Sequence, residues 1–176
     1  SIGIIVGAHV ADPETLLRHA DMAMYQAKNS GKAKYMFFDE TMHARLRETM
    51  KLEVDLRKSL ERSELRIYYQ PIIAVKQKDL VGFEALVRWQ HPEQGLLLPG
   101  IFIPIAEEIG LISDIDLWVL QQACKQLGLW QKETLHILTM SVNVSARSLL
   151  RTDFLNKLLR FIQESGIQTK QLRLEI

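Results

Sequence analysis

Apolar and polar residues alternate along residues 81–89, and this alternation predicts a β-strand. The residues between the apolar positions include Glu84 and Arg88, which a period of two places on the same face of the strand. Two interpretations of that face stay open: the two residues form a buried ion pair, or they belong to a functional site. The alternating apolar residues are Val81, Phe83, Ala85, Val87 and Trp89.

Extended and helical patterns follow one another around this central strand. Alternation of strands with helices is typical of a parallel sheet, so the expected fold class is α/β. The expected elements are a strand at 65–74, a turn at 77–79, a loop at 90–100, helices at 102–109, 113–130 and 152–165, the last ending at Gly166, and strands at 137–144 and 171–176.

The first part of the chain has a different organisation. An apolar run at 2–6 predicts a strand, Asp12-Pro13-Glu14 predicts a helix start, and an extended pattern returns at 34–38. Such a strand–helix–strand unit is too small to fold alone. Leucine and methionine residues four positions apart then predict a long amphipathic connecting helix within 39–62.

Composition narrows the class of protein. Hydrophobic residues make up 47% and charged residues 24%, as in ordinary soluble globular proteins. A formal net charge of +1 gives no broad basic surface for a nucleic acid polymer. The single cysteine, Cys124, fits a reducing compartment and a place in the core. With no apolar run of membrane-spanning length, we expect a cytoplasmic segment without membrane contact, while an anchor upstream of residue 1 stays an open alternative.

Several short motifs surround the central strand, which itself contains Glu84-Ala85-Leu86. The other motifs are Tyr68-Tyr69-Gln70-Pro71-Ile72, His91-Pro92 with Gly95, Phe102-Ile103-Pro104 with Ala106-Glu107, Ser141-Val142-Asn143-Val144-Ser145, and Leu174-Glu175-Ile176. With these motifs in this order, the chain resembles the EAL family of cyclic dimeric GMP (cyclic di-GMP) phosphodiesterases, whose name Glu84-Ala85-Leu86 spells.

The resemblance implies a (β/α)8 barrel of the TIM type with its site at the carboxyl ends of the strands. Glu84, Asn143 and Glu175 match family metal ligands that serve catalysis. Two carboxylates and one amide oxygen form a hard oxygen site, which suits Mg2+ or Mn2+ better than zinc. In the family, two such ions act together on a phosphodiester, opening cyclic di-GMP to linear pGpG.

The resemblance also implies contacts with the substrate cyclic di-GMP. Arg88 matches an arginine that binds a ligand phosphate, Gln70 and Leu86 match residues lining the ligand, and Pro104 matches one lying against a guanine. Without the resemblance, Gln70 would be interpreted as a hydrogen-bonding residue of the barrel interior and Pro104 as a helix-start proline.

Three segments near the amino terminus also form a recognisable pattern: Ser1-Ile2-Gly3-Ile4, Ala20 to Lys28, and Gly31-Lys32. Together they resemble the C-terminal end of a GGDEF (diguanylate cyclase) domain. Lys28 matches a lysine that holds a triphosphate, although a solvated cation at a helix end is the simpler interpretation. The signature loop of that family is absent from this sequence, so cyclase activity is not expected of these residues alone.

These observations predict a GGDEF remnant at 1–38, a connecting helix at 39–62, and the N-terminal half of an EAL barrel at 63–176, about four strands of the eight. The expectation is a fragment of a longer cyclic di-GMP phosphodiesterase, itself inactive because later acidic residues of the family pattern are missing. Two alternatives to the phosphodiesterase stay open: a non-catalytic cyclic di-GMP receptor and a translated piece without activity. Whether the longer protein forms a homodimer also stays open.

Overall fold

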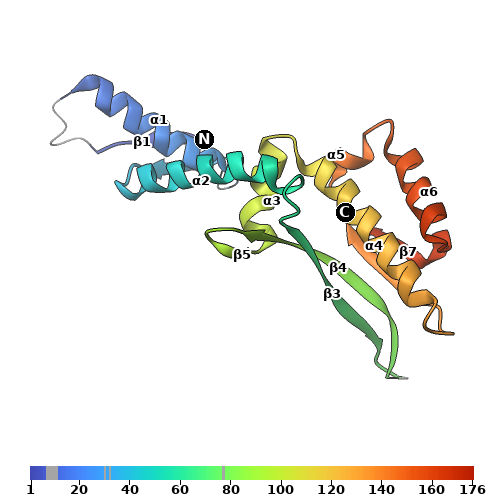
Figure 1. The fold of residues 1–176 in the computed structure, drawn as a ribbon. Helices are drawn as coiled ribbons and strands as arrows, with labels where there is room; N and C mark the ends of the chain where they lie inside the picture. Colours follow the sequence, from blue (N-terminus) through green and yellow to red (C-terminus); the bar gives the residue numbers. More distant parts are fainter. Residues whose placement is uncertain (7–11, 30, 32, 77) are drawn as a thin grey trace. The chain divides into compact units, whose positions relative to one another are not determined.

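The chain folds into two compact units, Ser1–Asp55 and Leu56–Ile176 (Figure 1). The computed structural model describes residues 1–6, 12–29, 31, 33–76 and 78–176. Lys32 of the GGDEF-like segment and Gln77 of the expected turn lie outside the described residues.

The first unit contains the predicted strand–helix–strand arrangement. Strands β1 (Ile2–Ile4) and β2 (Tyr35–Phe37) pair in parallel, and helix α1 (Pro13–Asn29) packs on both. Asp12 caps α1, because its carboxylate accepts hydrogen bonds from the backbone N–H groups of Glu14 and Thr15, both at 3.2 Å. Lys28 is exposed in the last turn of α1, as the interpretation as a solvated cation predicts. Helix α2 (Thr41–Ser59) follows.

The second unit contains a five-stranded mixed sheet. Its main path is β3 (Leu65–Ala74), β4 (Asp79–His91), β6 (Thr139–Asn143) and β7 (Leu172–Glu175), and β5 (Gly95–Leu97) pairs with β4. The β4–β6 and β6–β7 pairs are parallel, whereas β3 and β5 are antiparallel to β4. The parallel pairing predicted for the strands that alternate with helices is confirmed for β4, β6 and β7. Strand β3 is antiparallel to β4, since the short turn between them leaves no room for a crossover.

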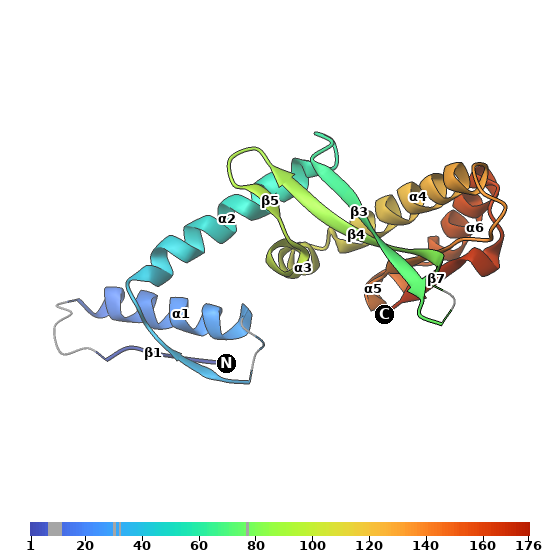
Figure 2. The same cartoon turned by 90° about the horizontal axis from the view of Figure 1, so that it is seen from below.

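Helices separate the parallel strands. Helices α3 (Pro99–Glu108) and α4 (Ile112–Gln131) lie between β4 and β6 in the sequence, and α5 (Ala146–Leu149), α6 (Phe154–Ser165) and the 3-10 helix η1 (Thr169–Gln171) lie between β6 and β7. Figures 1 and 2 show α4 and α6 side by side, with β3 and β4 as a long twisted ribbon. None of the described helices combines the length and apolar character that a bilayer-crossing segment requires.

The starts of two helices, α3 and α6, differ from the expected ones by more than one residue. Helix α3 begins at Pro99, a position where the missing N–H of proline costs no hydrogen bond, so Pro104 lies inside the helix and does not start it. Helix α6 begins at Phe154 and ends before Gly166, the predicted stop, whose positive φ of 72° forms a left-handed cap.

The core lies between α4, α6 and one face of the sheet. Met140 and Val142 of β6 are completely buried against α4, and Trp89 of β4 packs edge to face with Phe102 of α3 at 5.9 Å. Cys124 is completely buried in α4, as predicted, and burial raises the pKa of its thiol to about 12. The opposite face of β6 carries Thr139, Ser141 and Asn143.

Candidate active site

The three residues expected to bind metal come from the three parallel strands. Asn143 and Glu175 are the last residues of β6 and β7 and are directly paired across these strands. Glu84 lies within β4, which continues to His91. Only Gly82–Ala85 of β4 pair with β6, so Glu84 lies one residue before the end of this pairing. All three residues therefore lie near the carboxyl end of the parallel part of the sheet.

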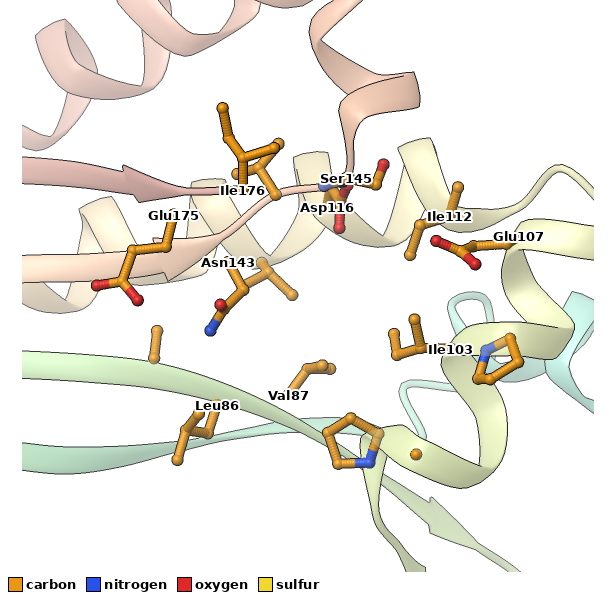
Figure 3. Close-up of a pocket in the computed structure, with 16 residues that line it drawn as sticks. Leu86, Val87, Ile103, Glu107, Ile112, Asp116, Asn143, Ser145, Glu175 and Ile176 are labelled. Carbon is orange, nitrogen blue, oxygen red and sulfur yellow. Dashed lines mark hydrogen bonds between the residues drawn. The ribbon is translucent and has the colours of Figure 1, made fainter. Parts of the chain in front are cut away.

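A hydrogen bond joins two of the three side chains. The Asn143 amide Nδ2 donates to Glu84 Oε1 at 2.9 Å. The expected ion pair between Glu84 and Arg88 is absent from the part of the chain that the structure describes, so the buried-ion-pair interpretation is wrong. Glu84 is half-buried, whereas Asn143 and Glu175 are exposed. Figure 3 shows Asn143 and Glu175 extending from neighbouring strands.

The donor set fits a hard divalent cation. The bond to Glu84 uses the amide nitrogen of Asn143, which leaves its oxygen, one oxygen of Glu84 and the carboxylate of Glu175 as potential ligands. The backbones of β4 and β7 lie about 10 Å apart across the sheet, with β6 between them, so long side chains can converge on one ion. Among the residues that the structure describes, no group of three or more His, Cys, Asp or Glu side chains is arranged to hold a metal.

Three of the four substrate-binding candidates, Gln70, Leu86 and Arg88, lie along the same face of the β3–β4 ribbon, and Pro104 lies in α3. Gln70 is directly opposite Glu84, and Tyr68 is opposite Leu86. Arg88 donates to the Val87 carbonyl at 2.8 Å, and its guanidinium carbon lies 5.9 Å from the centre of the Tyr68 ring. Sequence reasoning missed Tyr68, because the alternation in β3 alone does not reveal which residue of β4 it faces.

A pocket of about 420 Å3 adjoins the ends of these strands (Figure 3). Four of the seven predicted site residues line it: Leu86, Pro104, Asn143 and Glu175. The pocket lining does not include Gln70, Glu84 or Arg88, although Glu84 accepts a hydrogen bond from Asn143, which lines the pocket. The other lining residues are Ala85, Val87, Pro99, Gly100, Ile103, Glu107, Ile112, Asp116, Val119, Val144, Ser145 and Ile176.

A buried carboxylate lies behind the turn that follows Asn143. Asp116 of α4 is 6% exposed, and its Oδ2 accepts hydrogen bonds from the Ser145 backbone N–H at 2.8 Å and the Ser148 hydroxyl at 2.6 Å. Ser145 also caps the short helix α5. Sequence reasoning missed this group, and the signal for it was an aspartate flanked by the apolar residues Ile115 and Leu117 in a helix.

Comparisons with known proteins agree with the expected family. The family model for the EAL domain matches residues 53–176. The bifunctional diguanylate cyclase/cyclic di-GMP phosphodiesterase MucR of Pseudomonas aeruginosa is 37% identical over 179 residues, covering 100% of this chain and 26% of MucR. The chain thus spans about a quarter of the length of this curated relative.

Two solved structures resemble the chain. The structure described as "PaMucR Phosphodiesterase, c-di-GMP complex" matches with a TM-score of 0.68 and 36% identity, over 72% of this chain and 51% of that one. The apo S helix-GGDEF-EAL structure of LapD from Vibrio cholerae covers 99% of this chain and 41% of its own, with a TM-score of 0.60. At 16% identity, the LapD likeness shows the fold alone.

Proposed function

This chain belongs to the EAL domain family, and from that premise we propose that it is part of a longer, metal-dependent phosphodiesterase that hydrolyses cyclic di-GMP to linear pGpG. The observation that carries the proposal is the grouping of Glu84, Asn143 and Glu175 on three adjacent parallel strands. These residues belong to strands that are distant in the sequence, and they supply oxygen ligands beside an apolar pocket.

Glu84, Asn143 and Glu175 would hold the cations, Mg2+ or Mn2+, in a two-metal site that other residues complete. Such ions, when bound, neutralise charge on phosphoryl oxygens and activate water for attack on phosphorus. The Asn143 amide restricts the rotation of the Glu84 side chain by donating to one of its oxygens. This bond keeps the second carboxylate oxygen directed away from Asn143 and available as a ligand.

The other predicted residues would bind the substrate. Arg88 presents a planar guanidinium that suits a phosphate, and the Tyr68 ring beside it limits its freedom. Leu86 and Pro104 supply apolar surface in the pocket for a guanine base. Gln70, exposed opposite Glu84, supplies a hydrogen-bonding amide next to them.

We also propose the domain division 1–38, 39–62 and 63–176. The β4–β6–β7 succession, with helices between the strands, supports a partial (β/α)8 barrel in the last segment. MucR, which is named as a diguanylate cyclase as well as a phosphodiesterase, matches 100% of this chain at 37% identity and supports a GGDEF remnant in the first segment.

Substitution of Glu84 in the longer protein tests the function. We expect the wild-type protein to convert cyclic di-GMP to pGpG in Mg2+ or Mn2+, and to lose this activity when a chelator removes the metal. The Glu84→Ala variant should be inactive. Glu133→Ala, an exposed glutamate beyond the end of α4, is the matched control and should retain full turnover. Chromatography of the nucleotides measures turnover. Undiminished hydrolysis by Glu84→Ala would refute the ligand assignment, and cyclic di-GMP binding without hydrolysis by wild type would indicate a receptor.

A further inference from the structure

The turn after Asn143 is fixed on both sides by hydrogen bonds to other elements. The Val144 N–H donates to the Glu175 carbonyl of β7 at 2.8 Å. The next N–H, that of Ser145, donates to Asp116 of α4 at 2.8 Å. The two residues that follow the Asn143 side chain are therefore tied to the strand bearing Glu175 and to a buried carboxylate.

Asp116 also fixes the start of α5. Its Oδ2 accepts the Ser148 hydroxyl at 2.6 Å, and the hydroxyls of Ser145 and Ser148 lie 3.0 Å apart. One carboxylate oxygen thus holds both ends of the first turn of α5. Figure 3 shows Asp116 beside Ser145 at the pocket.

We propose that Asp116 is the positioning residue of this site: it fixes the Asn143–Ser145 turn, and through that turn it holds the Asn143 amide against Glu84. This inference rests on the proposed function. Without the carboxylate, the Ser145 N–H and the Ser148 hydroxyl lose their charged hydrogen-bond acceptor. The turn would then change conformation so that these two groups bond to other acceptors. The Asn143 amide oxygen and the Glu84 carboxylate would then no longer be held in place for a cation.

Hydrogen-bonded groups behind a metal ligand typically contribute about 10- to 100-fold to metal affinity or activity. We therefore expect Asp116→Ala to weaken Mn2+ binding by about this factor. Asp116→Asn keeps an oxygen of nearly the same position that can accept both bonds, so it should restore most of the affinity. Ser148→Ala removes one of the two bonds and should have an intermediate effect.

Gln171 supplies a matched structural control at the opposite end of the same strands. It is 4% exposed, donates to Gln131 Oε1 at 2.8 Å and to the Leu138 carbonyl at 3.1 Å, and precedes β7. Gln171→Ala should lower thermal stability without weakening Mn2+ binding, because its contacts lie at the start of β6 and not at its end.

The experiment uses the full-length protein with each variant. Free Mn2+ is measured by electron paramagnetic resonance during titration, together with thermal unfolding and the kcat and KM for cyclic di-GMP. We expect Asp116→Ala to weaken Mn2+ binding and lower kcat at saturating substrate, with a smaller change in KM, because Arg88 lies on another strand. If Asp116→Ala does not fold, Ser148→Ala and Asp116→Asn are compared with wild type, and Ser148→Ala should weaken Mn2+ binding more than Asp116→Asn does.

Two results would overturn the inference. One is an Mn2+ affinity of Asp116→Ala equal to that of wild type. The other is an equal loss of Mn2+ affinity in Asp116→Ala and Gln171→Ala when the two variants are equally stable. If Asp116→Ala does not fold, an Mn2+ affinity of Ser148→Ala equal to that of wild type would overturn the inference. Failure of the proposed function would be distinct, since wild-type protein itself would then neither bind Mn2+ at this site nor hydrolyse cyclic di-GMP.

Discussion

The close packing of α4 on α6 predicts that Gly128→Ala destabilises the second unit. A methyl group at Gly128 would lie 3.2 Å from the carbonyl carbon of Ser165 in α6, and still nearer to the carbonyl oxygen. Both atoms belong to the backbone, so relief requires α4 and α6 to move apart. This displacement would disturb the helix that carries Asp116 and the buried Cys124.

Two opposing effects set the magnitude. Overpacking of a close contact costs about 1–3 kcal/mol, while alanine in place of glycine inside a helix gains about 1 kcal/mol. The expected net destabilisation is therefore about 0–2 kcal/mol. Gly100→Ala in α3 is the matched control, because a Cβ there meets no atom within 4 Å. The difference between the two variants isolates the packing cost, about 1–3 kcal/mol.

Tryptophan fluorescence during urea unfolding measures this difference. Trp89, Trp118 and Trp130 are the three tryptophans of the chain, and all belong to the second unit, so the signal reports that unit. We expect a lower unfolding midpoint for Gly128→Ala than for Gly100→Ala. If Gly128→Ala is as stable as Gly100→Ala, the close contact of α4 with α6 is contradicted.

Two further predictions concern phosphate binding and pH. Arg88→Lys loses the planar guanidinium fork, so we expect KM for cyclic di-GMP to rise about tenfold, an effect of ~1.4 kcal/mol. Arg160→Lys, at an exposed position of α6, is the unaffected control. An equal rise of KM in the two variants would disprove the assignment. The hydrogen bond from Arg151, with that from Lys157, holds the pKa of Asp153 well below its ordinary value of 3.8. The stability contributed by Asp153 is therefore fully present above pH 3.8 and is lost as pH falls further. Acid titration of Asp153→Asn against wild type should show a stability difference that shrinks below about pH 3.8, and a constant difference would contradict this.

Local patterns located the elements that carry the site. The alternation around Glu84 predicted the central strand, and the strands ending at Asn143 and Glu175 followed from the same period of two. Gly166 marked the end of α6 because a left-handed cap favours glycine. These features depend on residues close together in the sequence.

Pairing between distant segments was not accessible to the same reasoning. Strand β5 has three residues and no periodic pattern of its own, so its place on β4 was missed. The bonds from Ser145 and Ser148 to Asp116 join residues about 30 positions apart, and the position of Tyr68 beside Arg88 depends on the register of β3 on β4. Such contacts are set by the assembled sheet.

Locating bound Mn2+ in crystals of the longer protein, by anomalous diffraction, tests the central claim most directly. We predict an Mn2+ ion coordinated by oxygens of Glu84, Asn143 and Glu175, within bonding distance of about 2.2 Å. Ordered Mn2+ bound elsewhere, with these three side chains directed away from one another, would contradict the proposed site.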